Sequence, residues 1–172
     1  MIKLVGAILI IGASALYGFY RASMFAERPR QIRAIIHVLN RLSTEIGYGS
    51  TLLPNALGKL SSQTKKPLDQ LFSSIAGKLQ PGMSITVKEA WQASIEEHWS
   101  RTAMKLPEKE ALLELGQSLG VSDREDQMKH LQLAVKQLQH EEAEASDEQW
   151  KYEKLCRSLG VLGGALIVIL IY

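Results

Sequence analysis

The chain has 172 residues, of which 46% are hydrophobic and 22% charged, and its formal net charge is +2. This length accommodates one modest domain with accessory segments. The single cysteine, Cys156, excludes an internal disulfide and fits a reducing compartment. All 18 acids and 19 of the 20 bases lie between Arg21 and Arg157, so two apolar ends flank a charged middle.

The amino-terminal run "LVGAILIIGASALYGFY", residues 4–20, carries no charge and predicts a transmembrane helix over residues 2–20. The alternative is a cleaved signal peptide, because Ala13-Ser14-Ala15 resembles a cleavage site. Basic residues that follow an apolar run oppose export of the next segment, and four arginines follow this one. We therefore favour the uncleaved anchor. These arginines are Arg21, Arg28, Arg30 and Arg33.

The middle of the chain predicts helices throughout. From Pro29 to Gly47, isoleucine and leucine recur at spacings of three and four, and proline suits a first helical turn. Further helices are predicted to begin near Thr51, Pro67, Ser84 and Pro107. Thr86 and Glu89 have the spacing of a capping box in the third of these. The helix that begins near Pro107 should end at Gly120.

The stretch "SLGVSDREDQMKHLQLAVKQLQHEEAE", residues 118–144, begins with a cluster of charges. Ser122 and Glu125 have capping-box spacing, and acids in a first turn are favoured by the helix dipole. We therefore interpret the cluster as a helix start, and we keep a contact with a partner as the alternative. The partner contact would use Asp123, Arg124, Glu125 and Asp126.

The carboxyl-terminal run "SLGVLGGALIVILIY" is short for a span, and by including Leu155 and Cys156 it predicts a second transmembrane helix over 155–172. A buried terminal helix is the alternative. Basic residues flank the charged middle, so the positive-inside rule places residues 21–157 in the cytoplasm. Small residues four apart suit close helix packing in a membrane, although glycine is also frequent there without that role. These are Ser14, Gly18, Gly160 and Gly164.

Charge is also segregated along the middle. Residues 21–66 hold eight bases and two acids, and residues 89–148 hold 14 acids and six bases. Arg28, Arg30 and Arg33 form a candidate partner-binding surface beside the first span. The acidic stretch 141–148 is either a solvated stalk or a docking surface, because it has few apolar residues to bury.

Four features carry a family resemblance: "ERPRQIR" after the first span, "EIGYGSTLLPNAL", "LGQSLGVSDREDQ", and a terminal span. The chain resembles the stage III sporulation protein AB family essentially from end to end. That family is similar to the cytoplasmic domain of type II secretion F proteins. Those proteins usually carry two such domains, so this chain would need oligomerisation or partners to form an equivalent platform. The resemblance implies a role in the channel complex between mother cell and forespore, with other membrane subunits and a secretion-type ATPase as partners.

The sequence therefore predicts an all-α protein: a compact bundle of about six helices, residues 26–150, flanked by amino- and carboxyl-terminal transmembrane helices. The leading function is a non-enzymatic membrane scaffold in the mother-cell membrane. A membrane-tethered enzyme is the second class, although the sequence has no phosphate loop, nucleophile elbow or metal-ligand spacing, and implies no cofactor. A secreted helical protein is the third. Nucleic-acid binding lacks motif support.

Overall fold

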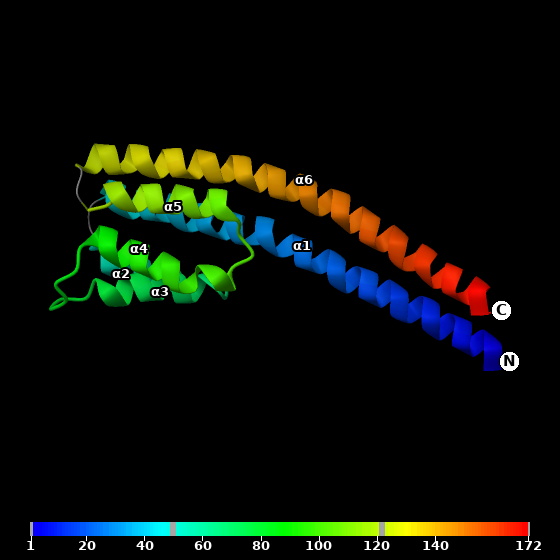
Figure 1. The fold of residues 1–172 in the computed structure, drawn as a ribbon. Coiled ribbons are helices and arrows are strands. Elements are labelled where there is room, and N and C mark those ends of the chain that lie inside the picture. Colours follow the sequence, from blue (N-terminus) through cyan, green and yellow to red (C-terminus); the bar gives the residue numbers. More distant parts are fainter. Residues whose placement is uncertain (1, 49–50, 121–122, 172) are drawn as a thin grey trace. The chain divides into compact units, whose positions relative to one another are not determined.

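A computed structural model describes residues 2–48, 51–120 and 123–171, and every regular element in these ranges is helical (Figure 1). Within them, side chains are described from Phe25 to Leu155 and at three further positions, Leu16, Ser158 and Leu162. The predicted all-α class is confirmed. The elements are α1 (Ile2–Tyr48), α2 (Leu53–Ser61), α3 (Leu68–Lys78), α4 (Val87–His98), the 3-10 helix η1 (Trp99–Arg101), α5 (Leu106–Ser118) and α6 (Arg124–Ile171).

The helix α1 contradicts one prediction. We expected a new helix to begin at Pro29, but α1 continues through Pro29 from Ile2 to Tyr48. Proline inside a helix removes a backbone hydrogen bond and costs about 3 kcal/mol. Pro29 is itself buried, as are Arg28 before it and Ile32 after it. Packing on both sides of the proline therefore offsets its local cost.

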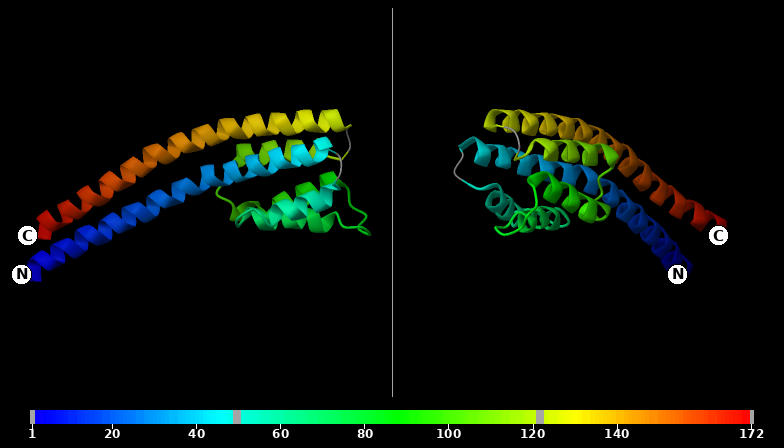
Figure 2. Two further views of the ribbon diagram at one scale, coloured as in Figure 1. Left: turned by 180° about the vertical axis from the view of Figure 1, so that it is seen from behind. Right: turned by 60° about the vertical axis from the view of Figure 1, so that its left-hand side comes forward.

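The chain divides into two compact units. The first, the paired-helix unit, comprises Met1–Pro29 and Ala143–Tyr172. Its two helical segments lie side by side in all views, and the two ends of the chain lie at the same end of this unit (Figure 2). The second, the bundle unit, comprises Arg30–Glu142.

In the bundle unit, α5 lies between α6 and α4, while α2 and α3 lie on the side away from α6 (Figures 1 and 2). The stripe predicted from Pro29 to Gly47 buries Ile32, Ile35, Leu39 and Leu42, whereas Ile36 and Ile46 are only half-buried. The core is aliphatic around two aromatic side chains, Phe72 and Trp91. Its other fully buried large side chains are Ile32, Ile35, Leu39, Leu42, Leu57, Leu68, Leu71, Ile75, Ile95 and Leu112.

The helix boundaries follow capping chemistry. Thr86 Oγ1 accepts a hydrogen bond from Glu89 N at 3.2 Å, and Thr86 N donates to Glu89 Oε2 at 2.9 Å. The predicted capping box at the start of α4 is therefore confirmed. Gly120, just after α5, has a φ of +80°, and an added Cβ would lie 2.7 Å from Val87 Cγ2. The predicted glycine stop is thus required by conformation and by space.

No helix in the described part of the chain is apolar over a long enough stretch to cross a membrane. The predicted spans, 2–20 and 155–172, fall almost entirely on residues whose side chains lie outside that part. The same holds for Ser14, Gly18, Gly160 and Gly164, whose proposed packing role stays a prediction.

Trp91 joins α4 to α5. Its Nε1 donates a hydrogen bond of 2.7 Å to the carbonyl oxygen of Leu112, and the indole is 1% exposed. The ring lies directly over Gly116, where an added Cβ would come within 2.4 Å of Trp91 Cδ1. Only glycine leaves room for the indole at this position in α5.

We expect Gly116→Ala to destabilise the protein. Alanine favours helix by about 1 kcal/mol over glycine, but overpacking a core costs about 1–3 kcal/mol. Gly77→Ala in α3 is the matched control, because no atom lies within 4 Å of its added Cβ and only the helix gain remains. Chemical unfolding followed by circular dichroism and by tryptophan fluorescence measures both variants. Equal stabilisation by the two alanines would contradict the packing of Trp91 on α5.

Candidate functional site

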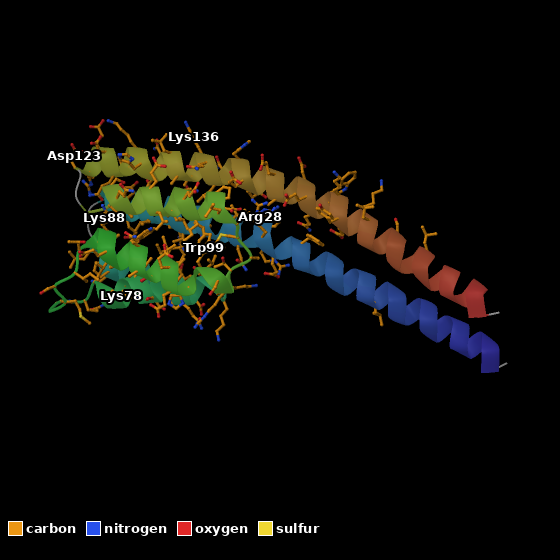
Figure 3. The ribbon with its side chains drawn as sticks, in the orientation of Figure 1. Arg28, Lys78, Lys88, Trp99, Asp123 and Lys136 are labelled. Atoms are coloured by element: carbon orange, nitrogen blue, oxygen red, sulfur yellow. The ribbon has the colours of Figure 1, made fainter. Side chains whose placement is uncertain are left out.

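The charged cluster that opens α6 lies in the bundle unit, and all four of its candidate side chains are exposed. Asp123 Oδ1 accepts a hydrogen bond of 2.9 Å from Asp126 N (Figure 3). Asp123 O also accepts one of 2.9 Å from Gln127 N. Asp123 is therefore the N-cap of α6. The prediction of Ser122 as the cap was wrong by one residue, and Ser122 itself lies outside the described residues.

Arg124 has a role that the sequence analysis missed. Its Nε donates a hydrogen bond of 2.6 Å to the carbonyl oxygen of Ile46, in the last turn of α1. The last four carbonyls of a helix lack partners within the helix, and a cation there is favoured by the helix dipole. The helix dipole disfavours a basic side chain in the first turn of its own helix. The position of Arg124 in such a turn is therefore a signal in the sequence that its side chain binds a group on another helix.

The two remaining acids of the cluster have a local partner. Lys129 Nζ lies 3.3 Å from Glu125 Oε1 and 3.8 Å from Asp126 Oδ1. Exposed pairs at this spacing contribute only about 0.3–0.5 kcal/mol each. No group of three or more potential metal ligands occurs among the described residues. The cluster thus has a complete structural explanation as a helix start, and its exposed face stays available to a partner.

The candidate arginines differ from one another. In the paired-helix unit, Arg28 is buried and its Nη1 lies 3.0 Å from Glu148 Oε2 on α6. In the bundle unit, Arg33 lies 2.6 Å from Glu142 Oε1 through Nη2 and donates to the same oxygen from Nε at 2.7 Å. Arg30 is exposed. Two of the predicted partner-binding arginines therefore bind acids of the same chain.

These pairs explain part of the acidic stretch 141–148. The sequence predicts either a solvated stalk or a docking surface for it. The structure adds a third role, because Glu142 and Glu148 are the counter-ions of arginines on α1. Ala145, between them, is 2% exposed, so this part of α6 also buries a small apolar side chain.

A pocket of about 260 Å³ lies between α5 and α6 in the bundle unit. Leu133 on its wall is 61% exposed, which is unusual for leucine beside a core. His130 of the lining follows Asp126 by one helical turn, so the pocket and the charged cluster share one face of α6. The lining residues are Ala111, Glu114, Leu115, His130, Leu133, Ala134 and Gln137.

A polar network between α3 and α4 is the nearest approach to a reactive constellation. Lys78 Nζ donates to Ser74 Oγ at 2.8 Å and to Ser94 Oγ at 3.3 Å, and the two hydroxyl oxygens are 3.0 Å apart. Lys78 Nζ also lies 2.8 Å from Glu97 Oε2. This hydrogen bond and the charge of Lys78 lower the pKa of Glu97. The network ties α3 to α4 through these hydrogen bonds and the ion pair.

The fold and these surfaces define a class: an all-helical protein in which a small bundle is joined to a pair of long helices. A family profile described as Stage III sporulation protein AB (spore_III_AB) matches residues 3–172. Stage III sporulation protein AB of Bacillus subtilis (strain 168) is 40% identical over 171 residues, which cover 99% of each chain. The chain belongs to the stage III sporulation protein AB family, and the predicted resemblance is confirmed.

A solved structure agrees with this assignment. Stage III sporulation protein AB (SpoIIIAB) has a TM-score of 0.69 and 38% sequence identity to this chain. The match covers 73% of this chain and 98% of the solved chain.

Asp123→Ala should destabilise the protein by about 0.5–2 kcal/mol, because it leaves the Asp126 N–H of α6 without its acceptor. Asp123→Asn is the matched control and should be nearly neutral, since asparagine caps as well as aspartate. Thermal unfolding of both variants measures the difference. If alanine and asparagine were equally tolerated, the cap would lie at another residue.

The ion pair of Lys78 and Glu97 should make stability depend on pH. The pKa of Glu97 is lowered in the folded state, so the folded protein binds fewer protons than the unfolded chain in the acidic range. The stabilisation by this pair is present above the ordinary glutamate range and is lost as the pH falls through the lowered pKa. Glu97→Gln should therefore be less stable than the parent at neutral pH and equal to it in strong acid. Glu110→Gln, on the exposed face of α5, controls for loss of a surface charge.

Proposed function

We propose that the protein is a non-enzymatic, membrane-anchored scaffold subunit of the sporulation channel complex between mother cell and forespore. The match to the family over residues 3–172 carries this proposal, because it includes both apolar ends as well as the bundle. The two leucines described within those ends support the anchors. Leu16 is 71% exposed and Leu162 is 65% exposed, and exposed leucines on neighbouring helices suit a lipid environment.

The bundle unit would then lie on the cytoplasmic side, where the basic residues that follow the first apolar run favour it. Its partners would be the other membrane subunits of the complex and a secretion-type cytoplasmic ATPase. A second copy of the chain would supply the domain that secretion F proteins usually duplicate.

Charged surfaces on α1 and α6 are the proposed points of contact. Arg30 is exposed beside arginines that bind acids of α6, so the three arginines have separable roles. Asp123, Glu125 and Asp126 present carboxylates at the opposite end of the bundle part of α1, near the carbonyl of Ile46 that Arg124 binds. A partner that reads such charges should bind more weakly as salt rises, because the Debye length falls from about 10 Å at 0.1 M to about 3 Å at 1 M.

Arg30→Glu should reduce recovery of the ATPase and the membrane subunits when the full chain is co-expressed with them and purified. It should change unfolding only slightly, because an exposed charge contributes little to stability. Lys88→Glu on α4 is the matched control, because it reverses an exposed base outside the proposed surface. Normal recovery of the partners with Arg30→Glu at low salt would show that the docking surface lies elsewhere.

The role of Arg33 needs a second design, because its reversal also breaks the pair with Glu142. The double variant Arg33→Glu with Glu142→Arg restores an ion pair in the opposite sense. If Arg33 only holds α1 to α6, the double variant should recover both stability and assembly. If Arg33 also contacts a partner, stability should return while assembly stays low.

A further inference from the structure

One segment of the paired-helix unit has a surface that the scaffold role does not use. From Trp150 to Leu155, each exposed side chain of α6 is aromatic, cationic or apolar, and the acid in this segment, Glu153, is half-buried. Trp150 is 69% exposed on a polar stretch of helix. Lys154 Nζ lies 5.3 Å from the centroid of its ring. An exposed tryptophan with lysines beside it suits a partner that is both apolar and anionic.

A ring contact shows which residue of α1 lies at this level. Phe25 and Tyr152 stack with centroids 4.8 Å apart and an interplanar angle of 10°. One turn earlier on α6, Glu148 pairs with the buried Arg28. Beyond Tyr152 and before Phe25, both helices continue into the apolar ends of the chain. The sequence thus changes from paired charges, through aromatic rings and then the basic residues Lys154, Arg157 and Arg21, to the apolar ends.

We propose that Phe25, Trp150, Lys151, Tyr152 and Lys154 form a headgroup belt, which lies in the interfacial layer of the membrane and binds anionic phospholipid. This inference rests on the proposed membrane anchorage. It adds the depth at which α6 lies in the membrane and the class of lipid that the belt binds. Tryptophan and tyrosine prefer the interface because they are amphipathic. Lysine near the surface attracts anionic headgroups by about 1 kcal/mol per charge.

Depth-dependent quenching tests the position of Trp150. The purified full chain is reconstituted in phosphatidylcholine vesicles that carry bromine either near the glycerol end or near the methyl end of the acyl chain. We expect the shallow bromine to quench more than the deep bromine, and we expect this difference to disappear in Trp150→Phe. Trp99→Phe is the control and should keep the difference, because Trp99 lies in the bundle unit.

Two results would overturn the belt while the chain still floats with the vesicles. One is Trp150 emission that is quenched by aqueous iodide and by neither bromolipid, which would place the residue in water. The other is emission shielded from all three quenchers, which would mean that a second copy covers it. Failure of the chain to float with vesicles would instead refute the membrane anchorage of the proposed function.

Lipid retention tests the chemistry of the belt. The full chain is extracted from vesicles of mixed phosphatidylcholine and phosphatidylglycerol, and the retained lipid is measured. Lys151→Gln and Lys154→Gln should each lower the preference for phosphatidylglycerol roughly five-fold, the equivalent of about 1 kcal/mol. Lys136→Gln, on α6 in the bundle unit, should leave it unchanged. Equal enrichment in all three variants would refute the anionic-lipid site.

Discussion

The pairing of arginines on α1 with carboxylates on α6 is the interaction on which the rest of the structure depends. The stretch 141–148 carries five acids, and a helix of that charge gains little from packing alone. In the bundle unit, Glu142 is neutralised by two contacts from Arg33, and in the paired-helix unit Glu148 is neutralised by Arg28. Both pairs join residues more than 100 positions apart, so they close the chain onto itself.

Arg28 shows why this neutralisation matters energetically. Its side chain is 9% exposed, and a buried guanidinium without a counter-ion costs several kcal/mol. The exposed pair of Arg33 is worth far less in stability, because water screens it. The two pairs look alike in sequence but differ in their surroundings: loss of Glu148 takes an acceptor from a buried guanidinium, whereas loss of Glu142 takes one from a solvated guanidinium.

The local features of the fold could be predicted from sequence because their causes are local. Apolar spacing from Pro29 to Gly47 predicted a buried face that includes Ile32, Ile35 and Leu39, and Thr86 with Glu89 predicted a capping box. Three features depend on distant residues and could not be predicted. Pro29 stays inside α1, where it is buried together with Arg28 and Ile32. Trp91 needs Gly116 from another helix, and Arg33 selects Glu142 from several acids. The cap at Asp123 was missed by one residue, because Ser122 and Asp123 are both good caps and spacing alone does not separate them.

The candidate site also combines features with local causes, which the sequence predicts, and features that depend on distant residues. The exposed charges at the start of α6 could be found in the sequence, but the bond from Arg124 to Ile46 could not, because it joins the ends of two helices that are distant in sequence. Because of this bond and the ion pairs, few buried charges among the described residues lack a partner. The exposed charges of these two helices include Arg30, the carboxylates of the α6 start, of which Glu125 and Asp126 pair with Lys129, and, in the paired-helix unit, the lysines beside Trp150. Each is chemically distinct, so the proposed protein partners and the proposed lipid would contact different parts of the same two helices.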